Sequence, residues 1–391
     1  MPLLSRRATL LGLATTLTAG RASVAFAAAV TEQRFVVILL RGALDGLAAV
    51  QPYGDPALRD LRGDLMLPDP GQDNGVLDLG GFHGLHPALA GMHGLYQANE
   101  LAVIHAVAGP YRSRSHFEAQ DYLESGADHR MTSGWLNRAA TMLPTRPGGA
   151  EAALAVGTGV GLMLRGPAPV GTWLPQTFAR PDPALYRTLA ALHRPDPLTG
   201  PAIAEGLHER GFTEAVLNGQ EAPKDKYSFP ALATAAGKLL ADANGPRLAV
   251  LELGGWDTHA AQKNRLPGVL GTLDRGITGL KSGLGPAWLR TAVLVMTEFG
   301  RTVRTNGTAG TDHGTAGVAF LAGGAIAGGR VLGTWPGLAD LLDNRDLAPT
   351  TDLRSVAKGL LAAHFKFPAA RLAAIFPDST AAPPLTGLLR S

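Results

Sequence analysis

Short runs of consecutive apolar residues recur along the chain, and each is bounded by glycine, proline or charged residues. Four of them are too short and too abruptly ended for helices, and they predict buried strands at residues 34–40, 101–107, 247–253 and 291–297. A weaker run at residues 152–156 predicts a fifth strand. Continuous rather than alternating hydrophobicity indicates burial on both faces, as in a parallel or mixed sheet covered by helices.

Patterns with helical spacing lie between these runs, at residues 115–124, 185–192, 201–217, 230–243, 262–280 and 351–365. The Pro/Gly/Ala-rich region at about 157–245 predicts a helical insertion, either a separate cap or part of the main body. The glycine-rich stretch at 323–329 lacks the Lys-Ser/Thr ending of a phosphate loop and predicts a turn between strands.

The first 27 residues have the features of a removable export signal. Arg6 and Arg7 precede an apolar run at 10–17, and Ala25-Phe26-Ala27 offers a cleavage site. Residues 5–10 resemble the twin-arginine signal, with Thr9 where Phe is usual. The alternatives are an ordinary secretory signal or an uncleaved anchor, although the apolar run is shorter than the about 20 residues of a membrane span. We expect export by the twin-arginine machinery to the bacterial periplasm or medium, with no stable membrane span remaining.

Composition narrows the classes of protein and of site. The 391 residues are 46% hydrophobic and 17% charged, with 50 glycines and 28 prolines, which fits a large α/β domain with many turns. Without residues 1–27, which hold three arginines and no acid, 32 basic residues face 32 acidic ones, so we expect no nucleic-acid partner. Because cysteine is absent, any metal needs oxygen and imidazole ligands.

Residues with reactive side chains follow all four strong strand predictions. They are Asp45 after the first, Ser113, Ser115 and His116 after the second, Asp257 and His259 after the third, and Glu298 with Arg301, then Asp312 and His313, after the fourth. In open α/β sheets, ligands bind outside the carboxyl ends of the strands, where the loops converge. The sequence therefore predicts one site at this edge.

The loop Asp257-Thr258-His259 predicts half of a metal site. Residues i and i+2 of an extended segment project to the same side, so a carboxylate and an imidazole can reach one cation. The alternative is that Asp257 caps a following helix. Asp312 and His313 favour the metal, with one of the pair as a ligand and the other orienting its partner.

Asp45 and Glu298 are further candidate metal ligands. A carboxylate directly after the first strand can bind a cation, and Glu298 can bring another carboxylate from the end of the fourth strand. The alternatives are a turn residue in Asp45-Gly46 and an internal ion pair between Glu298 and Arg301.

The segment SRSHFEAQ suggests a nucleophile. Ser115 fits a capping box with Glu118, but a hydroxyl at a helix N-terminus is also placed for attack, with Ser113 as its competitor. Arg112 and Arg114 can hold a phosphate or sulfate, and His116 can act as an acid or base.

The motifs LRGALDGL, SRSHFEAQDYLESG, GGWDTH, TEFGRT, GTDHG and TTDLRSV resemble, in this order, the domain of unknown function 1501 (DUF1501) family of the alkaline phosphatase and sulfatase superfamily. The resemblance covers residues 34–391 and implies a three-layer α/β/α sandwich around a mostly parallel mixed sheet, alkaline phosphatase-like. It also implies one or two divalent metal ions (Zn, Mn, Mg or Ca) that activate a Ser, Thr or formylglycine nucleophile. Two departures stand out: Glu298-Phe299 replaces an Asp-His pair, and the gap from Asp257 to His259 is two residues shorter.

Together these features predict an exported metal-dependent hydrolase of small or polymeric phosphate or sulfate esters. The predicted ligands are Asp45, Asp257, His259, Glu298, Asp312 and His313, and the predicted catalytic residues are Ser115, Ser113, His116, Arg112 and Arg114. The alternative is a non-catalytic exported binding protein with a degenerate metal site.

Overall fold

The computed structural model describes residues 32–144, 151–157, 159–175, 190–196 and 225–390, together with residues 188, 200, 203–204, 207 and 216–217. The predicted signal at 1–27 and much of the predicted insertion at 157–245 lie outside the described residues. So do half of the residues of the helix expected at 185–192 and most of those of the helix expected at 201–217. Within the described part of the chain, no helix combines the length and the apolar character needed to cross a membrane.

A nine-stranded sheet forms the centre of the fold. Its order is β11-β5-β10-β9-β1-β8-β6-β7, and β12 pairs with β5. The strands are β1 (Arg34–Arg41), β5 (Leu101–Ala108), β6 (Ala153–Val156), β7 (Val170–Trp173), β8 (Leu248–Gly254), β9 (Thr291–Thr297), β10 (Gly317–Ala322), β11 (Arg330–Leu332) and β12 (Thr351–Asp352). The five strands predicted from the sequence are confirmed as β1, β5, β6, β8 and β9, with boundaries shifted by at most one residue.

Strand direction brings the four reactive loops to one edge of the sheet. The pairs β1–β8 and β1–β9 are parallel, and β10 runs antiparallel to both β9 and β5. Two reversals leave β5 parallel to β9, so the carboxyl ends of β1, β5, β8 and β9 point the same way. The remaining pairings of the sheet, those of β6, β7, β11 and β12, are parallel. The predicted mostly parallel mixed sheet is therefore confirmed.

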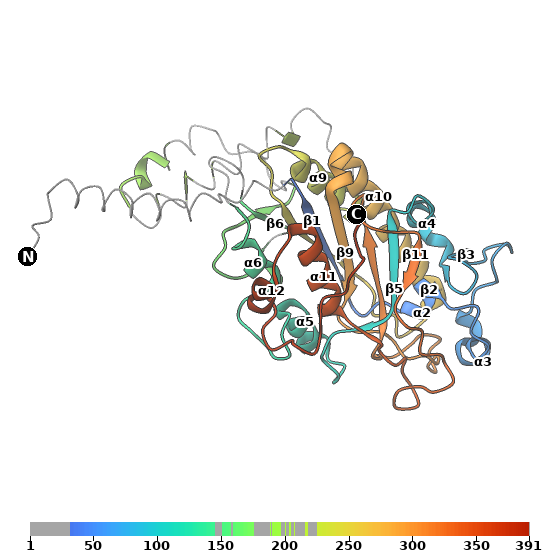
Figure 1. The fold of residues 1–391 in the computed structure, drawn as a ribbon. Helices are drawn as coiled ribbons and strands as arrows, with labels where there is room; N and C mark the ends of the chain where they lie inside the picture. Colours follow the sequence, from blue (N-terminus) through green and yellow to red (C-terminus); the bar gives the residue numbers. More distant parts are fainter. Residues whose placement is uncertain are drawn as a thin grey trace, which may run out of the picture.

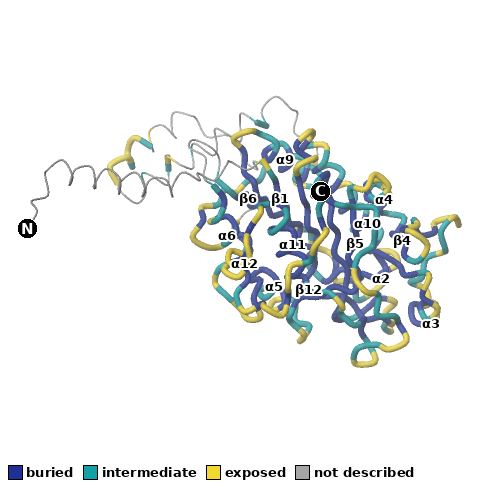
Figure 2. Tube along the Cα trace, in the orientation of Figure 1, coloured by how far each residue is buried: buried dark blue, intermediate teal, exposed yellow. Residues whose placement is uncertain are grey.

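Helices cover both faces, which gives three layers (Figure 1). Val36 and Ile38 of β1 point into a core closed by α4 (Ala90–Gln97), α9 (Phe229–Ala241) and α10 (Gln262–Leu284). Phe35 and Val37 point into the opposite core, closed by α5 (His116–Ser125), α6 (Trp135–Ala140), α11 (Leu353–Phe365) and α12 (Ala369–Ile375). Figure 2 shows the strands as the most deeply buried part, as the continuous apolar runs predict.

Smaller elements complete the fold beside β5. A three-stranded sheet has the order β2-β4-β3, formed by β2 (Val50–Gln51), β4 (Gly84–Leu85) and β3 (Leu77–Asp78). The short helices α2 (Gly46–Ala49) and α3 (Leu58–Arg62) lie nearby in the chain. The stretch 323–329 connects β10 and β11, as predicted.

Helix α10, which follows the Asp257 loop, begins at Gln262, whereas a cap at Asp257 would require it to begin at residue 258. The N-cap of α10 is Ala261, which has a φ of 50° and makes no side-chain capping bond. The alternative assignment of Asp257 as a helix cap is therefore wrong, and its carboxylate is free for another role.

Candidate metal centre

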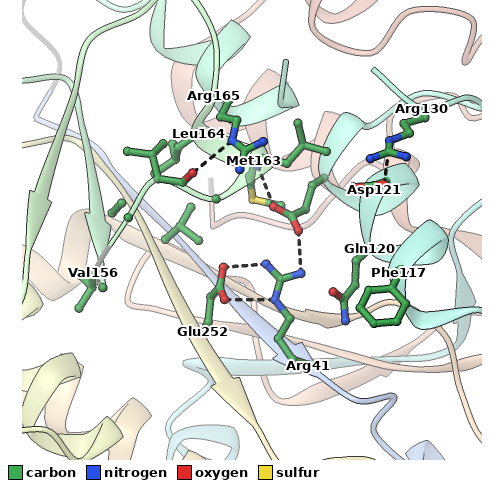
Figure 3. A pocket seen from close by; sticks show the side chains of 18 of the residues that line it. Arg41, Phe117, Gln120, Asp121, Arg130, Val156, Met163, Leu164, Arg165 and Glu252 are labelled. Atoms are coloured by element: carbon green, nitrogen blue, oxygen red, sulfur yellow. Dashed lines mark hydrogen bonds and ion pairs between the residues drawn. The ribbon is translucent and has the colours of Figure 1, made fainter. Parts of the chain in front are cut away.

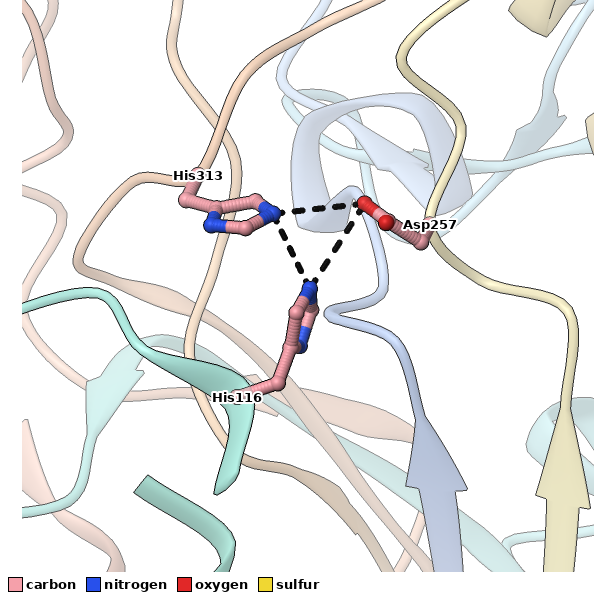
Figure 4. A group of neighbouring side chains, drawn as sticks. All are labelled: His116, Asp257 and His313. Atoms are coloured by element: carbon pink, nitrogen blue, oxygen red, sulfur yellow. Dashed lines mark hydrogen bonds and ion pairs between the residues drawn. The ribbon is translucent and has the colours of Figure 1, made fainter. Parts of the chain in front are cut away.

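Four side-chain atoms from three loops meet at the carboxyl edge of the sheet. They are Oδ1 of Asp257 and the Nε2 atoms of His116, His259 and His313. Oδ1 of Asp257 lies 3.7, 3.1 and 3.4 Å from the Nε2 atoms of His116, His259 and His313, respectively. Nε2 of His313 lies 2.9 Å from Nε2 of both His116 and His259. Figure 4 shows His116, Asp257 and His313 pointing toward one another.

These separations match those of ligands around one cation. Ligand atoms at about 2.0–2.1 Å from a tetrahedral metal lie about 3.3–3.4 Å from one another. The five separations given above, from 2.9 to 3.7 Å, bracket that value. The ligand atoms of His116, Asp257 and His313 all lie within 4.8 Å of one another, and His259 joins this group through its contacts with Asp257 and His313. We call these four residues the metal-ligand cluster.

The outer nitrogen of each imidazole faces an acceptor. Nδ1 of His116 lies 2.8 Å from Oε1 of Glu298, and Nδ1 of His259 lies 2.9 Å from Oδ1 of Asp312. Nδ1 of His313 lies 2.9 Å from the carbonyl oxygen of Arg114. Because a carbonyl or an ionised carboxylate only accepts, each Nδ1 carries the proton, so in the neutral rings three Nε2 lone pairs point inward. Such outer partners are characteristic of metal-binding histidines.

The Asp257 carboxylate is oriented by a hydrogen bond from Arg301. Its buried guanidinium donates from Nη1 to Oδ1 of Asp257 at 2.6 Å, and it also donates to the carbonyl and the hydroxyl of Thr311. The side chains of Asp257 and His259 are 45% and 42% exposed, so the cluster opens to solvent on their side. A cation bound here therefore has room for a further ligand.

The local backbone explains how the loop after β1 and the loop after β8 come into contact beside the cluster. Thr258 is fully buried and bonds Gln262, so in the extended Asp257-Thr258-His259 segment the two outer residues face the cluster together. Gly42 after β1 has a φ of 119°, and a Cβ there would lie 2.7 Å from the backbone nitrogen of Asp257. Only glycine allows this approach.

Hydrogen bonds and burial shift the pKa values within the site. Burial alone would raise the pKa of Asp257, but the hydrogen bond and charge of Arg301 outweigh it and keep that pKa below its usual value. The hydrogen bond to Glu298 raises the pKa of His116, whereas burial lowers that of His313. Glu298 thus stabilises positive charge at His116, whether a proton or a metal supplies it.

The outer carboxylates are ionised at neutral pH. Burial would raise the pKa of Glu298, but the hydrogen bonds from His116 and from neighbouring donors hold it below its usual value. The hydrogen bond from Asn306 lowers the pKa of Asp312. Both carboxylates can therefore accept from the imidazoles.

A family model described as "Protein of unknown function (DUF1501)" matches residues 102–376. The chain belongs to the DUF1501 family. No curated protein matches its sequence.

Several solved structures share the general fold at low identity. Ps i-CgsB in complex with k-i-k-neocarrahexaose has 10% identity and a TM-score of 0.40, with 90% of this chain and 77% of that chain covered. The C-terminal periplasmic domain of EcEptC from Escherichia coli, in complex with Zn, has 10% identity and a TM-score of 0.36 over 75% and 73%. Phosphonate monoester hydrolase of Agrobacterium radiobacter has 10% identity and a TM-score of 0.33 over 85% and 74%. At such scores we infer neither activity nor ligands from these proteins.

The DUF1501 chain brings only part of the predicted ligand set into the metal-ligand cluster. Asp257, His259 and His313 contribute inward atoms, and His116, predicted as an acid or base, supplies the fourth. Glu298 and Asp312 stand outside it. Oε1 of Glu298 accepts from Gly42 and Gln120 as well as from His116, at 2.9 and 3.1 Å, so this carboxylate orients an imidazole. It makes no ion pair with Arg301, contrary to the alternative assignment.

Asp45 lies outside the cluster in this DUF1501 chain. Its Oδ1 caps α2 by accepting from the amides of Leu47 and Ala48 at 3.1 Å. Its Oδ2 accepts from Arg62 at 2.5 Å and from Gln262 at 2.6 Å. The side chain is 1% exposed, so Asp45 takes the alternative role of a turn and cap residue, and Gln262 connects it to Thr258 beside the site.

Ser115 and Ser113 are near the cluster but do not contact it in the described hydrogen bonds. Ser115 is the N-cap of α5, directly before His116, and its hydroxyl makes no capping bond. Ser115 is therefore at the predicted N-cap position, but the predicted capping box is wrong because its hydroxyl does not accept from the helix amides.

Neither predicted anion-binding arginine points into the cluster. Arg114 donates to Asp346 at 2.8 Å and to Asp343 at 3.0 Å, and it contributes its carbonyl to His313 from a backbone with a φ of 62°. Arg112 donates to the carbonyls of Gly109 and Tyr111. The guanidinium at the site belongs to Arg301.

Two residues that orient the outer carboxylates were not predicted from the sequence. Gln120 donates to Glu298, and Asn306 donates to Oδ1 of Asp312 at 3.0 Å. The spacing of Gln120 from His116 on one helix, i and i+4, is the signal that indicates a shared face. Asn306 lies in a loop, where spacing carries no such information.

Proposed function

We propose that the protein is an exported metal-dependent hydrolase of phosphate or sulfate esters. The observation that carries the proposal is the convergence of three imidazole nitrogens and one carboxylate oxygen, with each imidazole held by an outer acceptor. A ligand set of three nitrogens and one oxygen favours Zn²⁺ over Mg²⁺ or Ca²⁺. A metal in such a position supplies Lewis acidity toward an ester oxygen and an activated water at neutral pH.

The chain's own residues supply the remaining functions. Arg301 fixes Asp257 and contributes positive charge next to the place where an anionic ester binds. Ser115, beside His116 at the N-terminus of α5, is the first candidate nucleophile, Ser113 is the second, and a metal-activated water is the third. Export to the periplasm or medium is proposed from the twin-arginine-like pattern at residues 5–10.

A second function is an exported binding protein that keeps the metal without turnover. The specific observation in its favour is that, among the described residues, neither the Ser113 nor the Ser115 hydroxyl makes a hydrogen bond to the cluster, and that of Ser115 does not cap α5 either. Metal binding is common to both functions, so only turnover separates them.

The test uses mature protein prepared without an affinity tag, stripped of metal and reconstituted with Zn²⁺, Mn²⁺, Mg²⁺ or Ca²⁺ in turn. Hydrolysis of para-nitrophenyl phosphate or sulfate that requires one of these ions supports the hydrolase. Stoichiometric metal binding without turnover of either ester supports the binding protein instead.

The nucleophile follows from the variants Ser115→Ala and Ser113→Ala, measured in parallel with metal content. Loss of activity with metal retained identifies the serine that attacks. Full activity in both variants assigns the attack to water.

A further inference from the structure

A polar pocket lies beside the metal-ligand cluster. It has a volume of about 720 Å³, within the range of small-molecule sites. Its walls come from α5, from residues 155–157 and 159–165, and from β1 and β8 (Figure 3). The mechanism proposed above uses none of its charged groups.

Helix α5 connects the pocket to the cluster. His116, Gln120 and Glu124 are four residues apart and lie on one face of the helix. His116 belongs to the cluster, whereas Gln120 and Glu124 line the pocket. At about 1.5 Å of rise per residue, Gln120 is about 6 Å and Glu124 about 12 Å from His116 along the axis. A group attached to an ester bound at the cluster reaches the pocket over this distance.

Five of the seven charged groups of the pocket are paired with one another, while Arg165 donates to the carbonyl of Val160 and Glu118 accepts from Tyr111. Arg41 donates to Glu252 at 2.7 and 3.2 Å, as Figure 3 shows. It also donates to Glu124 at 2.6 Å. Arg130 pairs with Asp121 at 2.9 Å. Four carboxylates and three guanidinium groups line the walls, so an additional anion gains little there. The paired groups keep spare lone pairs and N–H donors, which suit a ligand whose groups both donate and accept.

One exposed aromatic side chain lines the pocket. Phe117 lines it and is 84% exposed, the highest exposure among the exposed large hydrophobic residues of the described chain. It follows His116 directly. An exposed aromatic ring next to planar polar side chains offers a stacking face together with hydrogen bonds.

We infer that this pocket binds an uncharged, polyhydroxylated ring, that is, a sugar unit. Hydroxyl groups match the paired carboxylates and guanidinium groups, and the C–H face of the ring matches Phe117. Insofar as the sugar carries the ester that is cleaved, the inference rests on the proposed function, but binding of the sugar itself requires neither metal nor turnover.

The experiment measures binding of uncharged probes to metal-free mature protein by saturation-transfer NMR. The probes are the methyl glycosides of glucose, galactose, mannose and N-acetylglucosamine, with choline as a cationic comparison. We expect at least one glycoside to bind with a Kd of about 1 mM. Phe117→Ala should weaken it by about three- to tenfold, and Arg165→Ala, which removes an exposed pocket arginine, should weaken it as well.

Leu289→Ala is the matched control, because Leu289 is also an exposed large hydrophobic residue but does not line the pocket. It should bind like the unaltered protein. Three results overturn the inference: no glycoside binds at about 10 mM, binding is unaffected by both pocket variants, or choline binds in place of the glycosides. Glycoside binding is measured on metal-free protein, so it can be observed even if the metal-loaded protein hydrolyses no ester.

Discussion

Replacing Glu298 by Gln tests whether an outer carboxylate tunes the metal site. Glu298 is buried and accepts from Nδ1 of His116 at 2.8 Å. In Glu298→Gln, the amide oxygen can still accept from His116, while the new amide nitrogen can donate to the hydroxyl of Thr297, which can turn to the carbonyl of Leu40. The fold is therefore retained, and the negative charge behind the imidazole is lost.

Loss of such an outer partner typically costs 10–100-fold in metal affinity, or about 1.4–2.7 kcal/mol. We expect the Kd of Glu298→Gln for Zn²⁺ to rise by about 10–100-fold, measured by competition with a chromophoric chelator at neutral pH. Glu118→Gln is the matched control, since Glu118 is an exposed carboxylate on the same helix that bonds Tyr111. If both variants bind Zn²⁺ within about twofold of the unaltered protein, the charge of Glu298 does not contribute to metal affinity.

Two further predictions concern stability. Asp45→Ala removes the partner of the buried Arg62 guanidinium and should lower the free energy of unfolding by about 3–5 kcal/mol in urea titrations, and a loss below about 1 kcal/mol would contradict this. Burial lowers the pKa of His105 to about 3 and that of His364 to about 4, so the unfolded state binds protons at higher pH than the folded state. Their contribution to stability is complete above about pH 6.5 and is lost as the pH falls toward these values, by about 1.4 kcal/mol per imidazole per pH unit. In metal-free protein, His364→Gln should reduce the slope of the unfolding free energy against pH by about 1.4 kcal/mol per pH unit, the amount for one proton. An unchanged slope would show that His364 does not cause this pH dependence.

The sequence contained enough information for the edge of the sheet at which the site forms. Strands buried on both faces are visible as apolar runs, and parallel strands share a carboxyl end, so loops distant in sequence were expected to meet. The i, i+2 spacing of Asp257 and His259 correctly indicated that both side chains face one way, since an extended backbone alternates.

What the sequence did not contain is the direction of side chains that depends on non-local packing. Strand β10 inserts antiparallel between β5 and β9, and nothing in its residues specifies those partners. Glu298 and Asp312 have the chemistry of ligands, yet tertiary contacts turn them to the backs of His116 and His259. Asp45 has the right position in the chain, but Arg62 and its own helix amides occupy its oxygens.

Our proposal depends on the binding of one cation by His116, Asp257 and His313, with His259 as the fourth ligand. X-ray absorption spectroscopy at the zinc edge, on protein loaded with one equivalent of Zn²⁺, tests it most directly. We expect three imidazole nitrogens and one or two oxygens at about 2.0–2.1 Å from the zinc ion, with the imidazole signal reduced in His313→Ala. Failure to retain Zn²⁺, or a first shell made only of oxygen, would contradict it.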